Sequence, residues 1–136
     1  MVEAQVEGVT IRGRMDRLEH VDEGVRVTDL KTGKGGHSAK TVPDNPQLAA
    51  YQMALFASGE QVAGARIALL GGDKPKTFDQ KPLEGKTLEE WRGKVREVAA
   101  IARGPYFEAT PSEDACRCCS FDRLCPARER GRKVVE

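Results

Sequence analysis

Two carboxylates and a lysine are the first residues in this chain whose types and spacing could do chemistry. Asp29 and Lys31 stand two apart in the alternating run Val25 to Lys31, so their side chains project from one face of a strand. Asp16 belongs to the preceding strand-like run and comes within cross-strand reach if the two strands pair antiparallel. Clustered carboxylates repel each other, and a divalent cation relieves that repulsion. The alternative is a simple surface ion pair between Asp29 and Lys31.

A cation at this place would have ligands that suit it. Mg²⁺ prefers oxygen, and one carboxylate from each strand plus a backbone carbonyl would meet that preference. Lys31 could then orient or deprotonate an attacking water and help to neutralise a phosphate. The pattern therefore favours phosphate chemistry assisted by a metal ion.

All four cysteines lie within ten residues, at Cys116, Cys118, Cys119 and Cys125. The N-terminus carries acids where a secretory signal needs a basic start and an apolar run, so we expect a cytoplasmic protein. Cysteines in that setting indicate metal or redox chemistry more than a disulfide framework. Thiolates at this spacing are suited to an iron-sulfur cluster or to zinc.

Composition limits the other possibilities. The chain has 136 residues, which is the size of one ordinary domain, and no apolar run is long enough to cross a bilayer. A membrane protein is therefore excluded. The 22 basic and 21 acidic residues give a net charge of +1, so only local charge could attract nucleic acid. Basic residues gather in the segments 31–40 and 117–133, for which a solvated surface is the alternative interpretation.

The elements that would position these residues begin with strands. Val2 to Val6 and Val9 to Leu18 alternate around Gly8, which predicts a hairpin. A turn before Val25 makes the run from Val25 to Lys31 an antiparallel neighbour of the preceding strand. The glycine-rich segment from Gly33 to Asn45 is expected to be a mobile basic loop.

Helical spacing follows that loop. Asn45 as N-cap and Pro46 at the first helical position predict a helix that ends near Ser58. Val62 to Leu70 has strand composition, and a second helix is expected from an N-cap at Thr87 to Gly104. The order of elements predicts a mixed α/β layer in which helices pack on a sheet.

Four motifs in this order carry a family resemblance. They are Gly13 to Arg17, Val27 to Gly33, Gln47 to Tyr51, and Cys116-x2-Cys119-x5-Cys125-Pro126. Together they closely resemble the RecB-like branch of the PD-(D/E)xK nucleases, which includes AddB-type and actinobacterial helicase-nucleases. The resemblance implies an α/β, restriction-endonuclease-like fold, with a mixed sheet flanked by helices. It also implies a nuclease core over residues 1–110 and a cysteine-rich segment with a basic tail over 111–136.

The resemblance also implies a role for each site residue. Asp16, Asp29 and the carbonyl of Leu30 would bind Mg²⁺ or Mn²⁺, and Lys31 would be the catalytic lysine. Gln47 and Tyr51 would support the site, and their i, i+4 spacing places them on one helix face. Without the family, Tyr51 would be interpreted as a core aromatic residue.

The cysteine segment is similar to the iron-sulfur staple of that family. Cys116, Cys119 and Cys125 match three of the ligands of a [4Fe-4S] cluster. No cysteine precedes Cys116, and Cys118 is a poor replacement because it adjoins Cys119. We therefore expect the chain to be a fragment of a longer protein, and zinc or no metal at these thiols stays open.

The function implied is metal-dependent hydrolysis of DNA phosphodiester bonds in a helicase-nuclease of DNA repair or recombination. Its partners would be DNA and a helicase subunit or domain, with no membrane. Lys34, Lys40 and the C-terminal arginines are candidate phosphate contacts. The alternative is a non-catalytic DNA-binding or assembly module, and the isolated chain is expected to cleave weakly.

Overall fold

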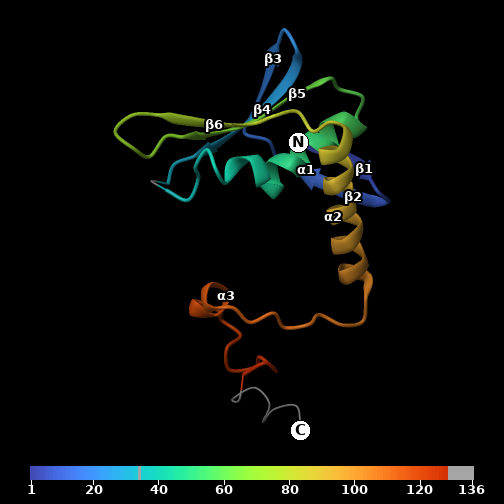
Figure 1. Ribbon diagram of the computed structural model, residues 1–136, viewed down its shortest axis with the longest axis vertical. Helices are drawn as coiled ribbons and strands as arrows, with labels where there is room; N and C mark the ends of the chain where they lie inside the picture. Colours follow the sequence, from blue (N-terminus) through green and yellow to red (C-terminus); the bar gives the residue numbers. More distant parts are fainter. Residues whose placement is uncertain (34, 129–136) are drawn as a thin grey trace. The chain divides into compact units, whose positions relative to one another are not determined.

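Residues 1–33 and 35–128 are described by a computed structural model, which divides the chain into two units (Figure 1). The first unit is Met1–Ala99 and contains every strand together with α1 and most of α2. The second unit begins at Ala100 and contains the end of α2, α3 and the cysteines. No helix in the described ranges combines the length and the apolar character that a membrane span requires.

A two-stranded sheet opens the chain. β1 (Val2–Val6) pairs antiparallel with β2 (Val9–Gly13), and both Glu7 and Gly8 in the turn between them have positive φ, as a tight hairpin turn requires. The predicted single strand from Val9 to Leu18 is wrong. β2 ends at Gly13, the chain leaves strand geometry through residues 14–16, and β3 (Arg17–Val21) joins a different sheet. An alternating pattern gives the spacing of side chains, but it does not show where a chain changes sheets.

The second sheet has four strands in the order β3-β4-β5-β6. β4 (Gly24–Lys31) pairs antiparallel with β3, as predicted, and parallel with β5 (Val62–Leu69). β6 (Lys76–Gln80) lies antiparallel to β5 at the edge, and no sequence pattern singled it out. Its residues are polar apart from Phe78, as is common in edge strands. This mixed sheet flanked by helices confirms the predicted restriction-endonuclease-like α/β class.

Helix α1 (Pro46–Ala57) begins where the sequence predicts. The side chain of Asn45 accepts a hydrogen bond from the backbone N–H of Leu48 at 3.0 Å, and Pro46 occupies the first turn. A short 3-10 helix, η1 (Val42–Asp44), precedes it, and Val42 is fully buried. The prediction of a mobile loop from Gly33 to Asn45 is therefore wrong for its last residues, because they form η1 and Val42 packs in the core.

Two further helices follow. Helix α2 (Gly85–Arg103) ends before Gly104, as predicted, but its start differs from the prediction. The N–H of Leu88 bonds to the carbonyl of Glu84, so the first turn forms upstream of Thr87 and Thr87 is not the N-cap. The short α3 (Glu113–Arg117) is capped by Ser112.

The core consists of two apolar clusters that share α1. One cluster packs α1 against β4 and β5, with Val27, Leu48 and Ile67 fully buried. The other joins α1 to β1 and α2 through Val6, Met53 and Trp91. Because α1 is held from both sides, the position of its first turn relative to the end of β4 is fixed.

Buried amides fix the same junction. Gln52 Nε2 donates to Gln80 Oε1 at 2.9 Å, and Gln80 Nε2 donates in turn to the carbonyls of Pro43 and Asn45 at 2.9 and 3.1 Å. Both side chains are almost completely buried, so each lost hydrogen bond would leave an unsatisfied polar group. Edge strand β6 is thereby tied to the beginning of α1.

Polar side chains hold the strands together on the other face of the sheet. Thr28 donates a hydrogen bond of 2.7 Å to Glu19, and that bond, with help from Arg17, lowers the pKa of the Glu19 carboxyl. Arg66 pairs with Asp79 across β5 and β6 at 2.6 Å. These contacts fix the register of the strands that flank Asp29.

Gly71 is required for the approach of the β5–β6 turn to the end of β4. The N–H of Leu70 donates to the carbonyl of Lys31 at 2.8 Å, and a Cβ on Gly71 would overlap the carbonyl of Thr32. At Gly72 the nearest atom to an added Cβ is 3.6 Å away. We predict that Gly71→Ala lowers the free energy of unfolding by ~1–3 kcal/mol.

Gly72→Ala is the matched control and should change the free energy of unfolding by less than ~0.5 kcal/mol. Both substitutions alter the unfolded chain alike, so urea denaturation of the two variants isolates the clash. Equal stabilities would show that the approach of Gly71 to Thr32 is not a packing constraint.

Candidate active site

The two predicted acidic residues lie on neighbouring segments at the end of β4. Arg17 faces Thr28 in the β3–β4 register, and continuing that register by one step places Asp16 beside Asp29. Asp16 lies in the bend before β3 and not within a strand, which corrects the predicted cross-strand position. Its Oδ2 accepts a hydrogen bond of 2.9 Å from the backbone N–H of Leu30. The carboxylate of Asp16 is thereby held against the peptide that follows Asp29.

Asp29, Lys31 and Gln47 form a closed set of contacts. Lys31 Nζ lies 2.8 Å from Asp29 Oδ2 and donates to Gln47 Oε1 at 3.2 Å. Gln47 Nε2 donates to Asp29 Oδ1 at 3.1 Å. The residue Asp29 is 3% exposed, whereas the Lys31 side chain is 33% exposed. A buried carboxylate thus has a cation and an amide as neighbours, and the cation faces solvent.

Tyr51 is a core residue whose hydroxyl reaches the site. Its ring belongs to the cluster between α1 and the sheet, and the residue is 9% exposed. Its Oη accepts a hydrogen bond from Gln47 Nε2 at 3.0 Å and donates to the carbonyl of Arg14 at 2.9 Å. The segment that carries Asp16 is thereby tied to α1. No sequence pattern marks the Arg14 carbonyl for this role, because backbone acceptors have no signature.

The donor set fits a divalent cation. Asp29 Oδ2 is buried and accepts no hydrogen bond of acceptable geometry from the described residues, although the ammonium of Lys31 lies close by. A buried oxygen without a donor is costly unless a cation satisfies it. Residues 1–33 and 35–128 contain no cluster of three or more acidic, His or Cys side chains that could hold a metal. A cation held by Asp16 and Asp29 would therefore take its other ligands from backbone carbonyls or water, which Mg²⁺ accepts.

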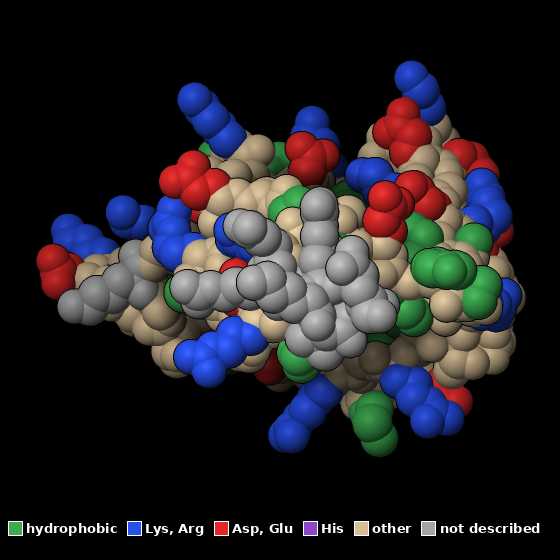
Figure 2. Space-filling view, turned by 90° about the horizontal axis from the view of Figure 1, so that it is seen from below, with side chains coloured by type: hydrophobic (Ala, Val, Ile, Leu, Met, Phe, Trp, Pro, Cys, Tyr) green, Lys and Arg blue, Asp and Glu red, His purple; other side chains and the backbone are tan. Residues whose placement is uncertain are grey.

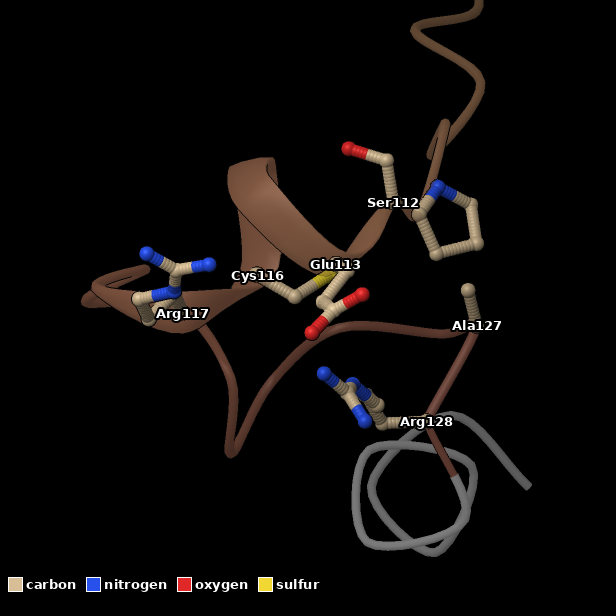
Figure 3. Close-up of a pocket in the computed structure, with 7 residues that line it drawn as sticks. Ser112, Glu113, Cys116, Arg117, Ala127 and Arg128 are labelled. Atoms are coloured by element: carbon tan, nitrogen blue, oxygen red, sulfur yellow. The ribbon is translucent and has the colours of Figure 1, made fainter.

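The cysteines lie in the second unit. Cys116, Cys118, Cys119 and Cys125 are free thiols, each exposed or half-buried. They do not meet in a metal-binding group in the part of the chain that is described. Cys116 lines a cavity of about 560 Å³. Figure 3 shows it together with Arg117 and Arg128, which line the same cavity. A hydrogen bond to the Cys116 sulfur raises the pKa of Arg128 above its ordinary value.

Comparisons with known proteins point to one family. The sequence model of the PD-(D/E)XK nuclease superfamily matches residues 1–126. The Gene 69 protein of Mycobacterium phage D29 is 27% identical over 130 residues, which is 91% of this chain and 45% of the phage protein. The Gene 69 protein of Mycobacterium phage L5 is 28% identical over 126 residues, or 90% of this chain and 41% of the phage protein. This chain therefore spans less than half of either relative.

A solved structure shows the same fold. The crystal structure of SSO0001 superposes with a TM-score of 0.53 at 20% sequence identity. The match covers 93% of this chain and 57% of the other. At that identity the likeness concerns the fold alone.

A substitution at Tyr51 can separate the role of its buried ring from the role of its hydroxyl. Tyr51→Phe keeps the ring and removes the hydroxyl that joins Gln47 to the Arg14 carbonyl. We expect the free energy of unfolding to fall by ~1 kcal/mol. Any nuclease activity should fall at least tenfold, because Gln47 and the segment that carries Asp16 lose their shared anchor.

Tyr106→Phe is the control, because Tyr106 is 85% exposed and should change neither quantity. Thermal denaturation and cleavage per folded molecule decide the question. A large loss of stability with full cleavage would make the Tyr51 hydroxyl a purely structural group.

Proposed function

The chain belongs to the PD-(D/E)XK nuclease superfamily. We propose that it hydrolyses DNA phosphodiester bonds, with Asp16 and Asp29 as ligands of Mg²⁺ or Mn²⁺ and Lys31 as the catalytic lysine beside the metal. One observation carries the proposal. Asp29 is buried beside Lys31, and its Oδ2 lacks a hydrogen bond from the described residues. Burying this carboxylate costs free energy, which the Lys31 ammonium offsets in part and a cation bound at Oδ2 would offset further.

The ligands for the cation would be Asp29 Oδ2, the carboxylate of Asp16 and the carbonyl of Leu30. The Leu30 N–H donates to Asp16 Oδ2 and so ties the bend that carries Asp16 to the end of β4, which carries Asp29 and the Leu30 carbonyl. When bound, the cation would supply a Lewis acid that lowers the pKa of water and offsets the charge on the phosphate oxygens. Asp16 and Asp29 supply the negative charge that selects a divalent ion.

Lys31 acts on the water and the phosphate. Its ammonium is held by the charge of Asp29 and by a hydrogen bond to Gln47, and the Lys31 side chain remains 33% exposed. In hydrolysis the water oxygen bonds to phosphorus, the bond from phosphorus to one ester oxygen breaks, and that oxygen leaves as a hydroxyl after taking a proton. The Lys31 ammonium donates a hydrogen bond to the attacking water and offsets charge on the phosphate, and the proton that the water loses passes to solvent. Gln47 and Tyr51 are positioning residues.

Contacts with DNA would be made through the backbone and would be independent of sequence. Figure 2 shows Lys and Arg side chains interspersed with Asp and Glu, in keeping with the net charge of +1. Lys40 is exposed in the loop before η1 and is available to a phosphate. Lys34, also predicted as a contact, lies outside the described residues, as do Arg130 and Arg132. Among the other C-terminal arginines, Arg117 and Arg128 pair with acidic neighbours.

Within the superfamily, we propose that the chain belongs to the RecB-like branch and acts with a helicase in DNA repair or recombination. This assignment is supported by the order of the four motifs and by the spacing of Cys116, Cys119 and Cys125. The cytoplasmic location also stays a prediction. In this proposal the cysteine segment binds iron or zinc and is completed by a ligand from elsewhere.

The metal site yields a prediction for three variants. Asp16→Asn and Asp29→Asn should each lower the affinity for Mn²⁺ at least tenfold in isothermal titration, because each removes a charged ligand. Lys31→Ala should leave Mn²⁺ bound and lower the cleavage rate about 10²- to 10⁴-fold, the usual range for assisted proton transfer. Cleavage is measured on single-stranded and duplex DNA with Mg²⁺ and with Mn²⁺.

Two controls carry the same charge changes at exposed sites. Asp44→Asn alters an exposed carboxylate of η1, and Lys86→Ala alters an ammonium that is 92% exposed on α2. Neither should change Mn²⁺ affinity or cleavage. Unchanged Mn²⁺ affinity in both Asp16→Asn and Asp29→Asn would exclude the assigned ligands. Metal binding without any cleavage would instead favour a non-catalytic DNA-binding or assembly module.

The thiols can be tested by metal content. Protein purified without oxygen should contain iron or zinc, and Cys116→Ser, Cys119→Ser and Cys125→Ser should each lower the bound metal. Cys118→Ser is the matched control and should leave the metal content unchanged. Elemental analysis checks the prediction, and a wild-type protein without either metal would contradict it. We expect less than one metal group per chain, because three thiolates do not complete a four-thiolate site.

A further inference from the structure

A second cavity lies next to the end of β4, the strand that carries Asp29 and Lys31. Its volume is about 680 Å³, within the ~300–1,000 Å³ range of ligand sites. Its walls come from the loop after β4 and from the β5–β6 hairpin, which run beside each other in Figure 1. The side chains that line it include His37, Leu69, Lys74, Lys76 and Phe78. All of these residues belong to the first unit.

The strand register places this cavity on the same face of the sheet as the candidate active site. Lys31 is opposite Leu69, and Leu69 is opposite Lys76. Residues opposite each other on paired strands project from one face, so these three form a row. Two strand spacings separate the backbone of Lys31 from that of Lys76 by ~10 Å. Phe78 continues the neighbouring row that starts at Asp29 and passes through Ile67.

The lysines of this cavity lack the partners that many other basic residues have. Lys74 and Lys76 are exposed, and neither forms an ion pair with any carboxylate in the described ranges. Arg66 and Arg92, by contrast, are each paired with acidic side chains. Asp73 also lines the cavity and lies beyond ion-pair distance of both lysines. The two ammonium groups are therefore available to an anion.

Two of the side chains that line the cavity are apolar. Leu69 is buried, and Phe78 is half-buried against the core cluster, so one part of its ring faces the cavity. Unpaired lysines next to an aromatic ring are the combination by which proteins hold single-stranded nucleic acid, because lysines bind phosphates and rings stack on bases. A base that enters such a cavity cannot stay paired with a second strand.

We propose that this cavity binds the nucleotide next to the scissile phosphate of a single DNA strand. Lys74 and Lys76 hold the phosphates, and Phe78 with Leu69 faces the base. The proposal rests on the proposed function, since it takes Asp29 and Lys31 as the point of cleavage. It makes the β5–β6 hairpin the element that guides a single strand across the end of β4.

The test measures binding without cleavage. A fluorescent oligothymidylate is titrated with the chain in EDTA at several salt concentrations, and its anisotropy gives Kd. Lys74→Ala/Lys76→Ala should raise Kd at least tenfold and lower the slope of log K against log salt by ~1.4, the value for two single-strand phosphates. Phe78→Leu should raise Kd about fivefold or more at an unchanged slope. Lys86→Ala, with its exposed ammonium on α2, is the control and should bind like the wild type.

The outcomes separate this site from the proposed function. Equal Kd for the double lysine variant and the wild type, including the case in which neither binds, overturns the proposal even if the wild type cleaves DNA. A loss confined to Lys74→Ala/Lys76→Ala and Phe78→Leu supports it. That same loss in a protein that cleaves no DNA with Mg²⁺ or Mn²⁺ would uphold the strand site and contradict the nuclease function.

Discussion

A buried carboxylate at the end of β4 is the constraint on which the rest of the molecule depends. Asp29 is 3% exposed, and a charge at that depth is stable only where other groups compensate it. Lys31 supplies one positive charge and Gln47 supplies one N–H, yet Oδ2 still lacks a proper donor from the described residues. The fold therefore preserves an acceptor oxygen that a cation can use, at a cost that core packing must offset.

The elements around β4 each hold one group of this site in place. The bend before β3 carries Asp16 to the N–H of Leu30, and the Tyr51 hydroxyl fixes that bend through the Arg14 carbonyl. The first turn of α1 carries Gln47. The position of that turn depends on the Asn45 cap and on the buried Gln80 amide of β6, which bonds to the Asn45 carbonyl. Because these contacts come from segments far apart in sequence, the site exists only in the folded chain.

Much of this arrangement could be predicted from local patterns. Alternation identified β4, and the Asn45–Pro46 pair placed the start of α1, because strand periodicity and helix capping are local properties. The end of β2 and the edge strand β6 were missed, since a change of sheet and a polar edge depend on tertiary contacts. Tyr51 shows most clearly what a local sequence pattern cannot predict. Its pattern fits a core aromatic and the family resemblance suggests a site residue; in the structure its ring packs in the core, while its hydroxyl bonds Gln47 and the Arg14 carbonyl.

In the proposed site, Asp16 and Asp29 would hold one divalent cation next to Lys31. The most direct test is an anomalous diffraction map of crystals of the chain soaked in Mn²⁺. If the two aspartates share one cation, the map will show one strong peak that touches a carboxylate oxygen of each aspartate and lies close to the Leu30 carbonyl. A map with no peak at that place, from a protein whose DNA cleavage requires Mn²⁺, would contradict this arrangement.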